Sequence, residues 1–268
     1  MKLGLQRGGG SSLLPQTKAY IDACPTPLSP ERVKAVNELI KDLIAGGIWA
    51  KTDKMGVLAN ESVNNAAINL RYPSLGAVPL GTLEYVNANP TMYETNKGIV
   101  RNNVGNNHIY TRYQPDGSNQ YKLDSACIAV WVLSIETTNY KTNMSSAGSM
   151  TALQSRRGDG TIGHGLNSAS LSSTVATPSI GFFGASRLSS AGYTVRQNNT
   201  EIAVTNSSQN LPSSVLALAG IHGSTANYSI VPHSFYYIGG GLTSGAGGEF
   251  EKLYLAWQKY LQTMGVIA

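Results

Sequence analysis

The feature that most constrains the fold of this chain is a long succession of short apolar segments. Between residues 75 and 245, segments of five to ten residues alternate with clusters of Gly, Asn, Ser and Pro, a pattern typical of strands joined by turns. No long helical pattern separates them, so a parallel sheet with crossover helices is disfavoured. We therefore predict two packed antiparallel sheets. The predicted strands cover residues 99–102, 125–134, 148–154, 162–167, 180–188, 193–197, 200–205, 215–222 and 235–239.

Two of the turns have recognisable chemistry. Asn198 and Asn199 lie between two of the predicted strands, and Asn tolerates the positive φ that a two-residue hairpin turn requires. Asp159 and Gly160 form a second turn signal.

A helix is predicted directly before this region. Ser29 is a favourable N-cap and Pro30 suits the first helical position, so the helix covers about residues 30–45 and ends at Gly46 and Gly47. One face of it carries an apolar stripe that we expect to be buried together with Trp49. The stripe consists of Val33, Val36, Leu39, Ile40, Leu43 and Ile44.

Two further helices and an extended segment complete the predicted organisation. A short helix is expected over about residues 55–70 and an amphipathic one over residues 249–262. Residues 1–28 resemble an extended arm, because apolar residues alternate at its start and a Gly/Ser run follows. The predicted units are therefore the arm at 1–28, a helical segment at 29–74 and a sandwich with its C-terminal helix at 75–268.

The arm is the candidate contact with other molecules. A Gly/Ser segment has a large ordering cost and little apolar area of its own, so we expect it to dock on another chain. The residues expected to make these assembly contacts are Met1, Leu3, Leu5, Leu13 and Leu14.

Composition excludes several classes of partner. Charged residues make up only 13% of the chain, and its net charge of +5 includes no run of Lys or Arg. Nucleic-acid binding normally needs a clustered basic surface, so it is not expected.

No apolar stretch approaches the roughly 20 residues of a membrane span, and no secretory leader is recognisable. Synthesis in a cytoplasm without membrane insertion is predicted. Cys24 and Cys127 fit no metal or redox spacing.

The sequence offers little catalytic chemistry. A glycosidase needs two carboxyl groups about 5–10 Å apart, and no acids of the β region recur at strand spacing. These acids are Glu84, Glu94, Asp116, Asp124, Glu136, Asp159 and Glu201. The four histidines are dispersed, and the run from Asp116 to Asn119 is interpreted as a turn rather than a calcium loop. No cofactor, metal or catalytic residue is predicted.

A set of tyrosines is the other candidate for recognition. Exposed Tyr side chains can stack on sugar rings or anchor a partner, although packing inside the sandwich is the simpler interpretation. The residues are Tyr85, Tyr93, Tyr110, Tyr113 and Tyr121.

Several short sequence segments, taken in their order along the chain, resemble the concanavalin A-like lectin/glucanase-type module of tailed-phage and prophage structural proteins. The similarity covers about residues 18–268. The hairpin departs from the family by having Asn198-Asn199 where Asn-Gly is usual, and residues 85–120 match weakly. The similar phrases are Gly47-Ile48-Trp49, Lys51-Thr52-Asp53, Ala66-Ala67-Ile68-Asn69-Leu70, Gly163-His164-Gly165-Leu166-Asn167, Ala185-Ser186-Arg187, Tyr193 to Asn198, and Gly239 to Leu261.

This resemblance implies a mainly β, antiparallel two-sheet jelly-roll sandwich with flanking helices. It also implies a non-catalytic virion protein of the tail, collar or fibre. Such a protein contacts other virion proteins through its arm, forms a homo-oligomer, and contributes to host-surface attachment. A carbohydrate-binding receptor module is the alternative, with a host glycan as ligand and no residues assigned to it. A glycan-cleaving enzyme on the same fold is the third hypothesis.

Overall fold

The computed structural model describes residues 12–75, 80–86, 93–100, 108–135, 137, 141–146, 150–157, 159–174, 179–221 and 228–268. Its helices are α1 (Pro15–Ala23), α2 (Pro30–Ala45), α3 (Val63–Ala66) and α4 (Glu249–Thr263), with 3₁₀ turns at Trp49–Lys51 and Pro73–Leu75. Its strands are β1 (Thr52–Val57), β2 (Glu84–Val86), β3 (Tyr93–Glu94), β4 (Gly98–Ile99), β5 (His108–Tyr110), β6 (Ala126–Val132), β7 (Lys141–Ser145), β8 (Met150–Arg156), β9 (Ile162–Ser168), β10 (Ser172–Thr174), β11 (Gly181–Arg187), β12 (Gly192–Gln197), β13 (Thr200–Thr205), β14 (Ala217–Leu218) and β15 (His233–Gly239).

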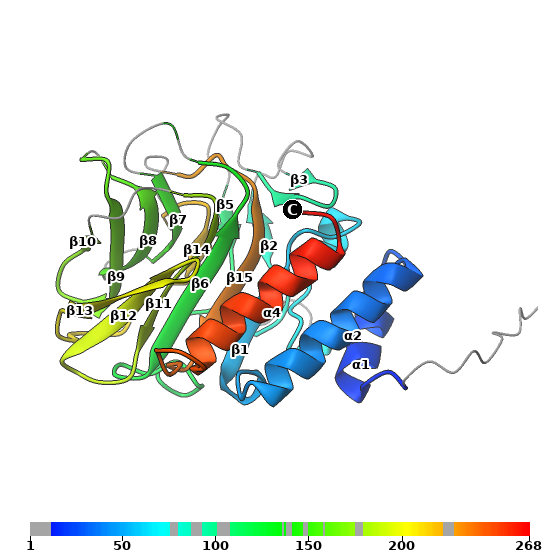
Figure 1. Ribbon diagram of the computed structural model, residues 1–268, viewed down its shortest axis with the longest axis horizontal. Coiled ribbons are helices and arrows are strands. Elements are labelled where there is room, and N and C mark those ends of the chain that lie inside the picture. The colour runs from blue at the N-terminus through cyan, green and yellow to red at the C-terminus, as the bar shows by residue number, and fades with distance from the viewer. Residues whose placement is uncertain are drawn as a thin grey trace, which may run out of the picture.

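The strands form two sheets (Figure 1). Sheet A has the order β13-β12-β11-β6-β15-β4-β3, and β1 also pairs with β15. Sheet B has the order β10-β9-β8-β7-β14-β5-β2. The strand pairs within both sheets are antiparallel. The predicted mainly β, two-sheet sandwich with flanking helices is therefore confirmed.

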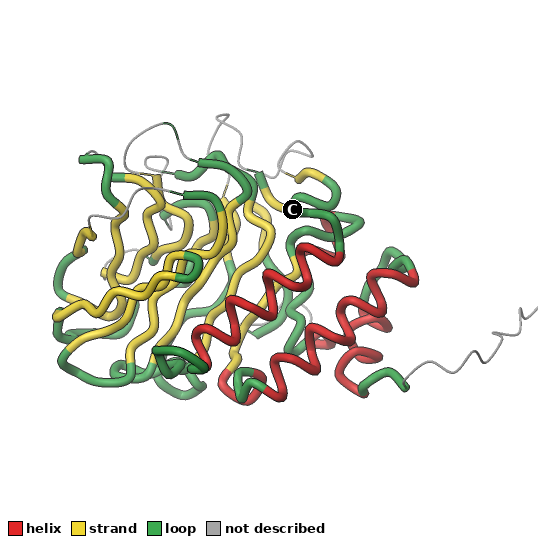
Figure 2. Tube along the Cα trace, viewed as in Figure 1, coloured by secondary structure: helices red, strands yellow, loops and turns green. Residues whose placement is uncertain are grey.

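Helices add a third layer on one side of the sandwich. Figure 2 shows α2 and α4 running side by side across sheet A, and α1 packs on α2. One apolar core lies between these helices and sheet A and includes Ile40, Trp131 and Trp257. A second core lies between the two sheets and includes Val130 and Leu166. Sheet A is thus buried on both faces.

Strand β6 is apolar along its whole length because both of its faces are buried. Cys127, Ala129 and Trp131 belong to the core beneath the helices, whereas Ile128 and Val130 belong to the core between the sheets. Successive side chains of a strand point to opposite faces, so a strand covered on both sides needs apolar residues at every position.

Two predictions about the N-terminal third need correction. Pro15–Ala23 is a helix, not part of an extended arm; Pro15 occupies its first turn, and Thr17 and Tyr20 are buried. Thr52–Val57 is a strand where a helix over 55–70 was expected, and only Val63–Ala66 is helical there. Its pairing with β15 overrides local helix propensity.

Helices α2 and α4 match their predicted ranges closely. In the predicted stripe of α2, however, Ile44 is exposed and Val33 is only half-buried, because α2 rests on the sheet along Val36, Ile40 and Leu43. The described helices include none that is both long enough and apolar enough to cross a bilayer.

Candidate functional site

The carboxylates of the sandwich have separate local partners. Glu84 pairs with Arg112, Glu94 with Lys97, and Glu201 with Arg196. Among the described acids of this region, no two share a hydrogen-bond donor. The remaining partners are Ser118 for Asp116, Ser208 for Asp124, and Thr161 for Asp159, while Glu136 lies outside the described residues. The predicted turns at Asp116 and at Asp159-Gly160 are thereby confirmed.

The most deeply buried carboxylate of the sandwich lies outside that predicted set. Asp53 of β1 accepts hydrogen bonds from the Tyr113 hydroxyl (2.8 Å) and from the backbone N–H groups of Gln120 (2.9 Å) and Tyr121 (2.8 Å). Burial raises its pKa, against the lowering effect of these donors. Its oxygens hold the 113–121 segment against β1, which is a structural role.

Two of the four histidines have described side chains, and both are buried rather than poised for metal binding. His164 and His233 are fully buried, and burial lowers the pKa of each to about 4. His164 Nδ1 lies 2.8 Å from the Tyr193 hydroxyl across the inter-sheet core. Within the described part of the chain, no group of three His, Cys, Asp or Glu side chains is arranged to hold a metal ion.

The tyrosines singled out in the sequence form no exposed platform. Tyr113 and Tyr121 are buried between the sheets with their rings edge to face at 6.4 Å. Tyr85 and Tyr93 are half-buried against the same core, and Tyr110 is half-buried on β5. The packing interpretation is confirmed for Tyr113 and Tyr121.

A different set of aromatic side chains lines an open pocket, which we call the hairpin pocket. It encloses about 330 Å³ where the β12–β13 turn and the start of β11 approach α4. Its walls are apolar at Trp131, Ile180, Tyr254 and Ile267 and carry amides at Asn198, Asn199 and Gln258, with Gly181 completing the lining.

The aromatic wall of the hairpin pocket is held rigidly. The rings of Trp131 and Tyr254 are stacked, with centroids 5.9 Å apart and planes 7° from parallel. Phe182 meets both rings edge to face. Tyr254 and Gln258 are four residues apart on α4 and therefore lie on one face of the helix.

The turn that forms the rim is fixed by Asn198. This residue has a φ of 52°, which Asn adopts more readily than most residues. Its Oδ1 accepts the N–H of Phe182 (2.8 Å), and its Nδ2 donates to the carbonyl of Ile180 (2.9 Å). Gly181 is required beside it, because a Cβ there would lie 2.0 Å from Asn198 Oδ1.

The chemistry of the hairpin pocket is neutral. No charged side chain of the described chain lines it, and the nearby Arg196 is paired with Glu201 and packed over Tyr254. The indole N–H of Trp131 has no hydrogen-bond partner among the described residues. Trp131 and Tyr254 are only 3% and 8% exposed and stack on each other, so little of either ring is open to a ligand. The accessible lining is Ile180, which is 49% exposed, together with the uncharged amides, and it suits an uncharged ligand that has both apolar and hydroxyl surfaces.

Sequence reasoning missed this pocket because its parts come from distant segments. Trp131 lies in the predicted strand 125–134 and Tyr254 in the predicted helix 249–262, and neither segment alone indicates a recognition site. The Asn198-Asn199 turn was recognised, but its position beside α4 is decided by tertiary packing.

The predicted assembly residues lie partly outside the described chain. Met1, Leu3 and Leu5 fall outside it. Leu13 is 45% exposed, and Leu14 packs against the helix-side core of its own chain. The Leu14 N–H also donates to Asn37 Oδ1 of α2 at 3.0 Å.

Comparisons with known proteins complete the description. No protein-family model matches the sequence, and no curated protein matches it. Among solved structures, the chain is similar to domain 4 of a GH43 extracellular arabinanase from Geobacillus stearothermophilus in complex with arabinotriose. The TM-score is 0.48 at 17% identity, covering 77% of this chain and 98% of that one. It is also similar to Trypanosoma rangeli sialidase in complex with sialic acid, with a TM-score of 0.48 at 9% identity; the match covers 84% of this chain but only 38% of the sialidase.

Proposed function

We propose that this protein is a non-catalytic recognition module of a tailed-phage particle, and that its β-sandwich binds a glycan of the host surface. The observation that carries the recognition role is the hairpin pocket, where stacked aromatic rings adjoin three uncharged amide side chains. Its volume of about 330 Å³ lies at the lower end of ligand pockets, which span roughly 300–1,000 Å³. One sugar ring suits this size.

The proposal of a non-catalytic role rests on the carboxylates. Glycoside hydrolysis needs one carboxyl group as acid and a second as base or nucleophile. Here Glu84, Glu94 and Glu201 each pair with a cation, and Asp53 holds a buried loop. Purified protein is therefore expected to release no reducing ends from host polysaccharide, and cleavage abolished by a single carboxylate substitution would contradict this proposal.

The virion role rests on the resemblance of the sequence to phage structural modules and on its weakly charged, Gly-, Asn- and Ser-rich composition. Quantitative mass spectrometry of purified particles tests this role directly. We expect the protein at a fixed copy number per particle, and its absence from particles would contradict the role.

The recognition role is tested by glycan-array binding with the full chain. Replacing Asn199 and Gln258 by Ala removes two amides from the hairpin pocket while leaving the core intact. Each lost hydrogen bond is worth about 0.5–1.5 kcal/mol, so the double variant should bind its best glycan at least about fivefold more weakly.

A matched control is Gln209→Ala, which removes an exposed amide outside the pocket and should bind like the parent chain. Equal binding by the parent and the double variant would place the glycan elsewhere. Absence of binding to any glycan would contradict the recognition role.

A further inference from the structure

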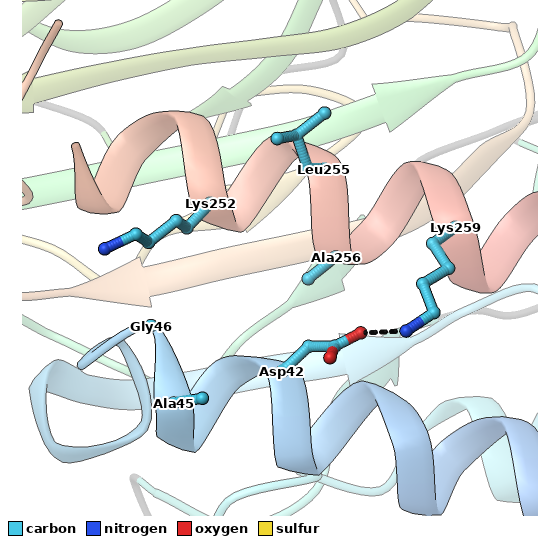
Figure 3. A pocket seen from close by; sticks show the side chains of 7 residues that line it. All are labelled: Asp42, Ala45, Gly46, Lys252, Leu255, Ala256 and Lys259. Atoms are coloured by element: carbon cyan, nitrogen blue, oxygen red, sulfur yellow. Dashed lines mark hydrogen bonds and ion pairs between the residues drawn. The ribbon is translucent and has the colours of Figure 1, made fainter. Parts of the chain in front are cut away.

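A second concave feature lies on the opposite side of α4, in the outermost layer of the molecule. Helices α2 and α4 pack side by side and leave a groove between their exposed faces (Figure 3). The groove has one hollow of about 290 Å³ and an adjoining one of about 360 Å³. Asp42, Ala256 and Lys259 line both hollows, and the Asp42–Lys259 ion pair (2.7 Å) crosses the groove between them.

Small residues keep the groove open. In Figure 3, Ala256 of α4 points toward α2, and Ala45 and Gly46 end α2 opposite Lys252. Leu255 stands on the rim and is 49% exposed. No segment of the described chain covers these side chains, so the groove presents uncovered apolar surface on the helical layer.

We infer that the N-terminal segment of a second copy of this chain, residues 1–7, occupies this groove. The inference rests on the assembly role that the sequence predicts for the arm, and it names the surface that would accept the arm. Met1, Leu3 and Leu5 supply apolar side chains on one face of an extended segment. Burying each of them against the groove removes apolar surface from water, which is the main source of favourable free energy in association.

The length of the groove fits such a segment. Ala35 lines the larger hollow and Ala45 the smaller one. A helix rises 1.5 Å per residue, which separates these alanines by about 15 Å. In an extended strand, Met1 and Leu5 are about 13 Å apart, so the segment matches the length of the groove. The two hollows share Asp42, Ala256 and Lys259 and therefore lie closer together than this length.

The charges of the arm complement one end of the groove. The segment carries Lys2 and Arg7. The larger hollow is lined by Glu31, Glu38 and Asp42 and also by Lys34 and Lys259. Glu38 pairs with Lys41 and Asp42 with Lys259, which leaves Glu31 as the carboxylate of this hollow with no ion-pair partner in the described chain. In an extended segment Arg7 lies on the same face as Met1, Leu3 and Leu5, and Lys2 on the opposite face, so Arg7 is the basic residue that can face Glu31.

Geometry favours a second copy over the chain's own arm. The described chain begins at Ser12. The Leu14 N–H donates a hydrogen bond to Asn37, which lies on the side of α2 that faces α1. With residues 1–7 in the groove, residues 8–11 would have to pass around α2, a path of about 16–19 Å for a helix about 10–12 Å wide. The five Cα–Cα steps from Arg7 to Ser12 span at most about 17–18 Å, so full extension of a Gly-rich linker would be needed, at a large entropic cost.

A complementation experiment with full-length chains tests the inference. One variant carries Leu3→Asp and Leu5→Asp in the arm, and the other carries Ala45→Arg and Leu255→Arg in the groove. By sedimentation velocity, the parent chain should associate as its concentration rises, whereas each variant alone should stay monomeric. An equimolar mixture should associate again, more weakly than the parent, because it contains intact arms and intact grooves on different chains.

The other outcomes are equally informative. Leu188→Arg, at an exposed leucine outside the groove, should associate like the parent. A parent chain that is monomeric at every concentration, a groove variant that still associates, or a mixture that stays monomeric would each overturn the inference. If the arm variant alone loses association while the groove variant keeps it, the assembly role stands and only the acceptor surface is wrong. Circular dichroism verifies that all variants are folded.

Discussion

At the scale of single residues, the interior contains cations that are held by backbone oxygens. Arg187 is fully buried, and its guanidinium donates to the carbonyls of Leu166 (2.9 Å) and Asn206 (2.8 Å). Lys54 is also fully buried and donates to the carbonyls of Thr82 and Thr111. Because a buried charge is costly without partners, these side chains tie loop segments to the strands that carry them.

Lys54 makes the stability of the protein depend on pH. Burial lowers the pKa of its ammonium group from 10.5 to about 7. Between these values the unfolded chain binds a proton that the folded chain lacks, so the free energy of unfolding rises with pH. The slope is at most about 1.4 kcal/mol per pH unit. Urea denaturation at pH 7, 7.5 and 8 should show this rise in the parent chain and its absence in Lys54→Met. Above pH 8 the thiols of Cys24 and Cys127, whose pKa values are raised by burial, contribute an opposite slope.

Lys18→Met is the matched control, because Lys18 is an exposed lysine paired with Asp22. It should keep the slope of the parent chain. An unchanged slope in Lys54→Met would show that Lys54 keeps its proton in the folded protein.

At the scale of elements, α2 has a well-capped N-terminus and buries one of its faces in the core. The Ser29 hydroxyl caps the first turn by accepting the Arg32 N–H, and Pro30 follows at the first helical position. Arg32 is buried and links α2 to α4 and to the segment after β1, through the Tyr260 hydroxyl (2.7 Å) and the Ala59 carbonyl (2.6 Å). The helix is thus fixed both by its apolar stripe and by one buried polar residue.

Two isoleucines of α2, about one turn apart, lie on different faces of the helix, one buried and one exposed. Ile40 is fully buried and Ile44 is 42% exposed. Ile40→Asp places a charge in the apolar core, where an unpaired carboxylate is strongly disfavoured, and should abolish soluble expression. Ile44→Asp should express normally and melt within a few degrees of the parent chain in a thermal scan. A soluble Ile40→Asp protein with unchanged melting temperature would contradict the assigned orientation of α2.

At the scale of the whole molecule, sheet A joins two cores into one cooperative unit. Phe182, Phe235 and Tyr237 point to the helices, whereas their neighbours Phe183 and Tyr236 point to sheet B. Strands β6, β11 and β15 thus belong to both cores at once. Loss of the helical layer would expose aromatic rings along one whole face of the sheet.

We therefore expect the helical layer and the sandwich to unfold together. Trp49, Trp131 and Trp257 all lie in the helix-side core, so tryptophan fluorescence reports on that layer. Hydrogen exchange of peptides from β8 and β9 reports on sheet B. In a urea titration the two midpoints should coincide, and Trp257→Ala should lower both together, by about 3–5 kcal/mol in unfolding free energy. Separate midpoints would show that the layers are independent.

The sequence alone determined the sandwich, the two long helices and most of the strands. Short-range signals were sufficient for these: the Ser29-Pro30 start and the apolar stripe for α2, and alternating apolar runs with Asn and Gly turns for the strands. It missed the helix at Pro15–Ala23 and expected a helix where Thr52–Val57 is a strand. It also did not identify the strands β2, β3, β5, β7 and β10. The helix Pro15–Ala23 is stabilised by the burial of Tyr20 and by a hydrogen bond that the Thr17 hydroxyl donates to Asn37 Oδ1. The segment Thr52–Val57 is a strand because it pairs with β15.

Only the tertiary structure decided where recognition surfaces lie. Trp131, Asn199 and Tyr254 are each ordinary for their own element, and they line a pocket because α4 crosses sheet A beside the hairpin turn. The groove between α2 and α4 likewise joins residues more than two hundred positions apart, such as Asp42 and Lys259. Local periodicity reports which face of an element is apolar, but it carries no information on which distant element covers that face. The position of a site depends on that pairing, so it appears only when the layers are assembled.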